Sequence, residues 1–192
     1  MEATPIIARI FTAHEAAQLF SHLVDLEVEY HKPYLRFNKP VKVPRGQASF
    51  TLDETIHYSY KAAGGSPPNR TMDETLLTIT ARVNRSLGTS FNTILMNVYR
   101  SGEDCFAFHR DSTDGWVPGS GFATLSFGAI RDFQLRSNET NHVTTIAHEP
   151  GVAIYMPHPM NDHFTHGIPK RKRVDECRIS LTFREIAPVR EG

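Results

Sequence analysis

The sequence predicts a mainly β protein with flanking helices, in which two sheets form a double-sheet barrel or jelly roll. Two helical patterns come first, and after Gly88 the chain changes to short segments rich in β-branched and aromatic residues. Gly, Pro, Asn and Asp separate these segments, and neither an internal repeat nor a low-complexity linker interrupts the 192 residues. We therefore expect one domain over residues 1–192, with a pocket between its sheets.

The two helices are predicted from their start signals and apolar stripes. Thr12 and Glu15 form a T-x-x-E capping box, and Thr71 with Glu74 repeats that pattern. Apolar residues then recur at helical spacing, namely Ala16, Leu19, Phe20 and Leu23 in the first helix and Leu76, Ile79, Val83 and Leu87 in the second. Gly88 is a typical stop for the second helix.

The strands are predicted from about residue 91 to residue 185, which would be the catalytic β core. They are Phe91–Tyr99, Ala123–Phe127, Phe133–Arg136, His142–Ala147, Val152–Met156 and Cys177–Arg184. The preceding segment, about 32–70, contains several prolines and many aromatic residues. We interpret it as a covering flap over the barrel mouth, and plain packing against the barrel is the alternative.

Composition limits the classes of partner and the cellular compartment. Lys+Arg and Asp+Glu both number 21, so nucleic acid could be bound only through a local basic patch. The only two cysteines, Cys105 and Cys177, favour reduced thiols in an intracellular protein. Neither a signal-peptide pattern nor a long apolar run is present, so we expect no membrane partner. The location would be the nucleus in a eukaryote and otherwise the cytoplasm, and we expect a monomer.

A set of potential metal ligands follows the first long strand. The spacing of His109 and Asp111 places both on one face of an extended segment, and His166 comes 57 residues later. Two imidazoles and one carboxylate on one side of a metal are typical of non-haem Fe(II) oxygenases. The pattern alone is weak, because four other histidines compete with His166: His142, His148, His158 and His163.

The last strand adds a second functional signal. Alternation places Ile179, Leu181 and Phe183 on one face and the polar residues on the other, namely Arg178, Ser180, Thr182 and Arg184. Arginines that point into a cavity are costly unless anions balance them. A dicarboxylic acid such as 2-oxoglutarate offers a carboxylate to each guanidinium. Solvated arginines on an exposed edge strand are the alternative.

Several motifs in register resemble the AlkB dioxygenases, especially the animal homologue that repairs duplex DNA. They are Asn97-Val-Tyr99, His109-Arg-Asp111, Ser126-Phe-Gly-Ala-Ile-Arg131-Asp-Phe133, His166-Gly-Ile-Pro169 and the strand Arg178–Arg184. The likeness runs from about Pro44 to Glu185. It implies the double-stranded β-helix (jelly-roll) dioxygenase fold and the use of Fe(II), 2-oxoglutarate and O2. The implied reaction is oxidative dealkylation of alkylated bases, which yields the repaired base, an aldehyde, succinate and CO2.

The resemblance also implies which residues form the site. Fe(II) would be held by His109, Asp111 and His166. The 2-oxoglutarate site would comprise Asn97, Tyr99, Arg178, Ser180 and Arg184, with Arg178 and Tyr99 on the far carboxylate. Ser180 stands where many relatives have asparagine.

Contacts with alkylated DNA or RNA are implied at three places. Arg45, Tyr58 and Tyr60 match flap positions near the flipped base, and Phe37 matches an aromatic wedge or, alternatively, a core residue. The basic run comprises Lys170, Arg171, Lys172 and Arg173, for which nuclear import and a solvated turn are alternatives. Ser112 and Thr113 replace acidic residues that read the damaged base in that homologue, which weakens the expectation of a cationic lesion.

Three classes of function stay open on the sequence. The leading one is oxidative dealkylation of nucleic acid. The second is a 2-oxoglutarate-dependent oxygenase with a protein or lipid substrate. The third is a non-catalytic binding module that keeps the barrel and lacks iron.

Overall fold

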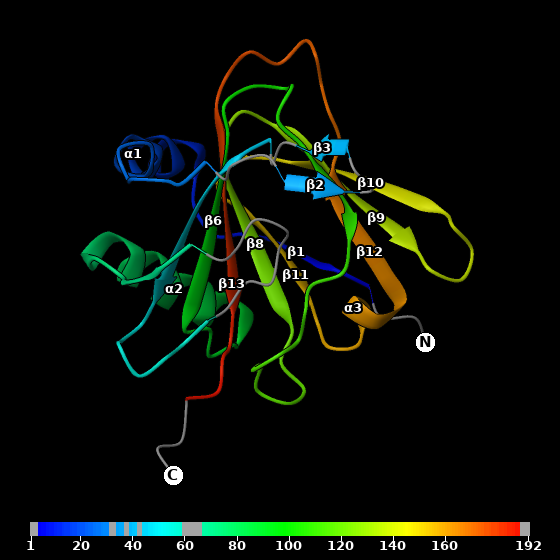
Figure 1. Ribbon diagram of the computed structural model, residues 1–192. Helices are drawn as coiled ribbons and strands as arrows, with labels where there is room; N and C mark the ends of the chain where they lie inside the picture. Colours follow the sequence, from blue (N-terminus) through cyan, green and yellow to red (C-terminus); the bar gives the residue numbers. More distant parts are fainter. Residues whose placement is uncertain (1–3, 31–33, 37–38, 42–43, 59–66, 189–192) are drawn as a thin grey trace.

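The computed structural model describes residues 4–30, 34–36, 39–41, 44–58 and 67–188 (Figure 1). Its strands are β1 (Ile6–Arg9), β2 (Tyr34–Arg36), β3 (Lys39–Val41), β4 (Gly46–Thr51), β5 (Asn69–Thr71), β6 (Thr93–Tyr99), β7 (Phe106–His109), β8 (Phe122–Gly128), β9 (Arg131–Ser137), β10 (Val143–His148), β11 (Val152–Met156), β12 (Phe164–Ile168) and β13 (Arg178–Arg184). Its helices are α1 (Ala13–Leu23), α2 (Glu74–Leu87) and α3 (Met160–His163). In these ranges, no helix is long and apolar enough to cross a membrane.

The strands from β6 onward form a double-stranded β-helix. The seven-stranded sheet has the order β1-β11-β8-β13-β6-β4-β5, and the four-stranded sheet has the order β10-β9-β12-β7. From β6 to β13 the chain passes between the two sheets at every step except the β9–β10 hairpin, whose strands pair directly. The predicted jelly-roll fold is therefore confirmed, and the space between the sheets is where a pocket can form.

Two hydrophobic cores lie on opposite faces of the seven-stranded sheet. The first joins Leu23 of α1 and Ile79 of α2 to Leu181 of β13. The second lies between the sheets and includes Leu95 of β6 and Phe133 of β9. In Figure 1, α1 and α2 accordingly lie on the side of the seven-stranded sheet that faces away from β9 and β12. This two-sided burial explains why all seven residues of β13 are buried.

The first predicted helix has the expected cap, whereas the second starts differently. Thr12 caps α1 with a complete capping box to Glu15. In α2, however, Asp73 is the N-cap, and its side chain accepts from the Leu76 amide at 2.8 Å. The predicted cap Thr71 instead ends β5, because it pairs with Thr51 in the sheet. Gly88 ends α2 in the left-handed conformation, as expected.

The predicted flap over residues 32–70 is divided in the structure. β2 and β3 form a separate two-stranded sheet, and its covering role stays a prediction. The strand β4 belongs to the seven-stranded sheet, where it pairs with β6 and is buried along its whole length. The flap prediction was therefore too broad, because Ala48 and Phe50 pack into the hydrophobic core.

Arg131 joins two loops at one end of the barrel. Its guanidinium donates to the carbonyl oxygens of Ser101, Asp104 and Pro169 at 2.7–2.9 Å, and only 1% of the residue is exposed. These bonds connect the loop after β6 with the turn that follows β12. Arg131 thus helps to hold the loop that leads into β7, together with the backbone hydrogen bonds of Gly102 to Val174 and Arg171.

We expect Arg131→Met to lower the free energy of unfolding by about 3–5 kcal/mol, because the carbonyl oxygens lose a charged donor. Urea denaturation measures the change. Arg131→Lys keeps the charge and one or two of the hydrogen bonds, so its free energy of unfolding should fall by less. A methionine variant as stable as the wild type would contradict this account.

Candidate active site

Three potential metal ligands converge at one end of the space between the sheets. His109 is the last residue of β7 and pairs directly with His166 of β12, so the two imidazoles are cross-strand neighbours with ring centroids 4.2 Å apart. Asp111 Oδ1 lies 3.4 Å from His109 Nε2 and 3.8 Å from His166 Nε2. One ligand atom from each residue lies within 4.8 Å of the other two. The structure therefore selects His166 over the four competing histidines.

Asp111 reaches this cluster from the loop that follows β7. β7 ends at His109, and Asn161 of α3 then holds the backbone of Asp111. The Asp111 amide donates to Asn161 Oδ1 at 3.0 Å, and Asn161 Nδ2 donates to the Asp111 carbonyl oxygen at 2.9 Å. His109 and Asp111 thus point to the same site, as their spacing predicts, and a side-chain clamp in place of strand pairing holds Asp111 there.

Asn161→Ala removes both of these bonds without touching a ligand atom. We expect about a 10-fold loss of Fe(II) affinity or more, as is typical when a group that orients a metal ligand is removed. Anaerobic titration with Fe(II) measures the change. Asn138→Ala, which loses an exposed bond to the Asp162 carbonyl oxygen, is the control and should leave the affinity unchanged. Equal affinities in the Asn161 variant and the wild type would exclude a positioning role.

The Asp111 carboxylate is oriented by a buried arginine. Arg184 donates to Asp111 Oδ2 from Nη2 at 2.5 Å and from Nε at 3.1 Å, and both side chains are 3% exposed. Burial opposes the charge, but Arg184, together with the two histidines, lowers the pKa of Asp111 well below its usual range. Asp111 is therefore an anion whose Oδ1 faces the imidazoles. Among the described residues, this buried oxygen has no hydrogen-bond donor.

The protonation of the imidazoles fits a cation at this point. His109 Nδ1 lies 3.0 Å from the Ala107 carbonyl oxygen, which can only accept, so Nδ1 carries the hydrogen. In the neutral ring, the Nε2 lone pair of His109 then faces Asp111 Oδ1. Burial, with a further contribution from His109, lowers the pKa of His166 to about 3. Two imidazole nitrogens and a carboxylate oxygen in this arrangement suit a divalent metal such as Fe(II).

The same cavity extends along β6 and β13. Its lining includes the three potential ligands and five polar residues from these strands: Asn97, Tyr99, Ser180, Thr182 and Arg184. The register explains the grouping, because Tyr99 pairs with Arg178 and Asn97 pairs with Ser180. The predicted alternation of β13 is confirmed, since Ile179, Leu181 and Phe183 lie in the core on the opposite face.

Arg178 is completely buried and pairs with Tyr99, which lines the cavity. Its guanidinium carbon is 5.2 Å from the centroid of the Tyr99 ring, which forms part of the cavity wall. Burial lowers the pKa of Arg178, but only to about 10, so the group remains a cation at neutral pH. The predicted alternative of solvated arginines on an exposed edge is therefore wrong, because neighbouring strands flank β13 on both sides.

Two further predicted co-substrate residues have defined polar partners. Asn97 Oδ1 accepts from Arg45 Nε at 2.8 Å and from Gln47 Nε2 at 3.0 Å. Since both partners donate, the oxygen of the Asn97 amide is assigned, and its NH₂ group is the part that can donate to a ligand. Ser180 shares a 2.7 Å hydrogen bond with Thr124, which also lines the cavity.

Arg45 is buried beside the metal cluster. Its guanidinium carbon lies 3.5 Å from the centroid of the Phe106 ring, and Phe106 in turn stacks on His109 with centroids 3.6 Å apart. Arg45 is 4% exposed, and Tyr58 is 6% exposed beneath the guanidinium of Arg184. Their predicted contacts with a flipped base stay predictions. Phe37 and Tyr60 lie outside the described residues.

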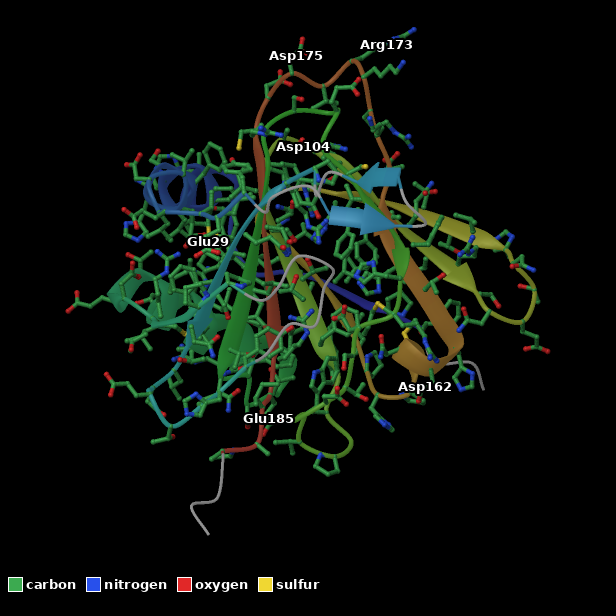
Figure 2. All side chains as sticks on the ribbon, in the orientation of Figure 1. Glu29, Asp104, Asp162, Arg173, Asp175 and Glu185 are labelled. Atoms are coloured by element: carbon green, nitrogen blue, oxygen red, sulfur yellow. The ribbon has the colours of Figure 1, made fainter. Side chains whose placement is uncertain are left out.

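The basic run is partly paired within the chain. Lys170 Nζ lies 3.1 Å from Glu103 Oε2, and Arg171 pairs with Asp132. Lys172 and Arg173 are exposed, and Figure 2 shows Arg173 at the tip of its loop. Ser112 is also exposed, next to Asp111, where its hydroxyl accepts from the Asp114 amide at 3.3 Å. The nucleic-acid contacts predicted for these five residues remain untested.

Several residues of the site were not predicted as members of it. The aromatic walls Phe106, Phe122 and Phe133 and the polar residues Thr124, Asn161 and Gln47 belong to this group. Phe122 and Phe133 contact His166 with centroid distances of 5.1 and 5.6 Å. The alternation of β8 and β9 could have indicated these inward-facing rings. No local pattern marks Asn161, which lies 50 residues from Asp111.

Comparison with known proteins agrees with this geometry. Residues 4–184 match the 2OG-Fe(II) oxygenase superfamily. The chain is 34% identical to the DNA oxidative demethylase ALKBH2 of Bos taurus, over 93% of this chain and 67% of that protein. It is also 34% identical to ALKBH2 of Homo sapiens, over 92% and 71% of the two chains. The solved structure of OsALKBH1 matches with a TM-score of 0.64 and 14% identity, over 96% and 99% of the chains.

The fold, the cluster of potential ligands and the matched residues define an Fe(II)- and 2-oxoglutarate-dependent dioxygenase, which uses O2 as its oxidant. Within that superfamily, the chain belongs to the AlkB family. The match begins at residue 4, about forty residues before the likeness that the motifs alone indicated.

Proposed function

We propose that this dioxygenase removes alkyl groups oxidatively from bases in nucleic acid, with DNA as the favoured substrate. One observation carries the proposal: the His109–Asp111–His166 cluster and the polar faces of β6 and β13 line one cavity. The relatives named DNA oxidative demethylase supply the substrate class. Because a base inside a duplex cannot reach a cavity between two sheets, the target must be flipped out or already single-stranded.

Different residues of the cavity would bind the metal and the co-substrate. His109, Asp111 and His166 would hold Fe(II), which supplies the oxidising chemistry when bound. Arg184 fixes the carboxylate of Asp111 so that one oxygen remains for the metal. Tyr99 and Arg178, with the Asn97 amide, would bind and orient 2-oxoglutarate. Phe106, Phe122 and Phe133 line this end of the cavity and would limit the access of water to the bound metal.

The direct test is turnover of an alkylated oligonucleotide, followed by mass spectrometry in the presence and absence of 2-oxoglutarate. We expect the wild type to restore the base and release an aldehyde only with the oxo acid present. Asp111→Ala should do neither. Equal aldehyde release by the two proteins would exclude the proposal, and turnover on a protein or lipid substrate alone would favour the second class of oxygenase.

The basic run gives a separate prediction about DNA binding. Replacing Lys172 or Arg173 with alanine should reduce the salt dependence of oligonucleotide binding by about one ion per lost phosphate contact. Lys170→Ala should have a smaller effect, because Glu103 already balances that charge. Binding measured over a range of salt concentrations tests this order. If the salt dependence of binding were unchanged in all three variants, the basic run would not contact the nucleic acid.

We also propose that the protein acts as a monomer. The support is that one chain by itself brings His109, Asp111 and His166 together, so the potential metal site needs no residue from a second copy. A molecular mass in solution twice that of the chain would contradict it.

A further inference from the structure

His148 is a buried histidine that the metal cluster does not use. It is the last residue of β10 in the four-stranded sheet, and it is 0% exposed. The ring packs edge-on against Phe133, with centroids 6.0 Å apart. It also contacts β13 of the opposite sheet, because Arg178 Nη2 lies 3.0 Å from His148 Nδ1. This hydrogen bond therefore joins the two sheets beside the paired residues Arg178 and Tyr99, whereas Arg184 at the other end of β13 contacts the metal cluster.

The partners of His148 fix its tautomer. Its Nε2 lies 2.9 Å from the Val152 carbonyl oxygen, which can only accept, so Nε2 carries the hydrogen. The Nδ1 atom consequently accepts from the guanidinium of Arg178, which can only donate. A second proton on this ring would face the cation. Burial, followed by the charge of Arg178, accordingly lowers the pKa of His148 to about 3.

The guanidinium of Arg178 is held at two of its three nitrogens. Nε donates to Ser126 Oγ at 2.9 Å, and Nη2 donates to His148. Because the guanidinium is planar, these two bonds fix the direction of the third nitrogen, Nη1. Nη1 is buried and has no acceptor among the residues that the structure describes. A buried cationic donor beside Tyr99, which lines the cavity, is suited to bind an anion.

We propose that His148 is a positioning residue for the co-substrate, and that it orients Arg178 so that Nη1 meets the distal carboxylate of 2-oxoglutarate. The choice of an imidazole has a physical reason. An aspartate or glutamate at this position could hold the guanidinium equally well, but it would neutralise the charge that the co-substrate requires. A neutral imidazole orients Arg178 and leaves its positive charge for the ligand. The inference rests on the proposed function only in requiring that the oxo acid binds in this cavity.

A matched pair of variants separates the two hydrogen bonds of His148. His148→Asn places an amide oxygen near the position of Nδ1, so it can keep the acceptor for Arg178. His148→Gln places its amide near the position of Nε2, so it can keep the donor to Val152 and loses the acceptor. Both variants retain a polar side chain with one of the two original bonds.

The probes are two oxo acids bound anaerobically to the Fe(II)-loaded protein. 2-Oxoglutarate has a distal carboxylate and 2-oxobutyrate has none, and the charge-transfer absorption of the iron–oxo acid complex reports the Kd of each. We expect His148→Gln to raise the Kd of 2-oxoglutarate by about 10- to 100-fold and to leave that of 2-oxobutyrate unchanged. His148→Asn should remain close to the wild type for both acids, and Fe(II) affinity should not change in either variant.

Three results would overturn the proposal: an equal loss of affinity for both acids, an equal effect of the two variants, or no effect of His148→Gln on 2-oxoglutarate. The first would indicate a general structural role. Failure of this proposal can be distinguished from failure of the proposed function. A wild type that binds 2-oxoglutarate yet repairs no oligonucleotide would refute only the substrate class. A wild type that binds neither acid would overturn both.

Discussion

Asp111→Asn is expected to abolish turnover and to weaken Fe(II) binding by more than about 100-fold, beyond the loss typical of orienting groups. The reason lies in the direction of the side chain. Arg184 can only donate, so the asparagine oxygen must turn toward Arg184. The NH₂ group then takes the place of Oδ1 and points its hydrogens at the position between the two imidazoles. A metal ligand would thus become a donor that repels the cation.

The same substitution removes the counter-charge of a buried arginine, so the folded state must be verified before the iron titration. Thermal unfolding and near-ultraviolet circular dichroism of the metal-free variant serve this purpose. Asp175→Asn, at an exposed carboxylate labelled in Figure 2, is the matched control and should bind iron like the wild type. Retained Fe(II) affinity in a folded Asp111→Asn protein would remove this residue from the metal site.

Arg178→Met is expected to raise the Kd of 2-oxoglutarate by at least about 30-fold. Truncating one partner of a buried, hydrogen-bonded charge pair typically costs about 2–5 kcal/mol, and methionine fills similar space without a charge. Fe(II) affinity should be unchanged, because the arginine that contacts the metal cluster is Arg184 and not Arg178. Anaerobic isothermal titration measures both affinities, with Fe(II) added to the metal-free protein and 2-oxoglutarate added to the iron-loaded protein.

The control for Arg178→Met is Arg85→Met, at an exposed position in the last turn of α2. It changes the net charge by the same amount and should leave both affinities unaltered. If the two variants bound 2-oxoglutarate equally well, the co-substrate would have to bind elsewhere. If Arg178→Met also weakened Fe(II) binding, the roles of Arg178 in co-substrate binding and of Arg184 at the metal cluster would not be independent.

Much of the fold could be predicted because its strongest elements follow local rules. The capping box at Thr12 and the alternation in Arg178–Arg184 each determine a local structure that the tertiary fold retains. The strand β4 escaped prediction because prolines and aromatic residues surround it and its pairing partner β6 is distant in sequence. The cap of α2 was misplaced because Thr71 and Asp73 both match a start signal, and only the sheet pairing of Thr71 separates them.

The residue types of the site could be predicted from the sequence, whereas many of the contacts between these residues could not. The motifs brought His109, Asp111 and His166 together correctly, since two of them are directly paired across β7 and β12. The contact of Arg45 with a flipped base stays a prediction, and its stacking on Phe106 and its hydrogen bond to Asn97, 52 residues away, were not predicted. His148 was considered only as a competing metal ligand. Its pairing with Arg178 depends on how two sheets face each other, which no local pattern specifies.

The most direct test of the account is a crystal structure of the protein loaded anaerobically with Fe(II) and 2-oxoglutarate. We expect iron bound by His109, Asp111 and His166, with the distal carboxylate of the oxo acid on Arg178. Iron bound by a different set of residues, or an oxo acid outside the cavity between the two sheets, would contradict the account.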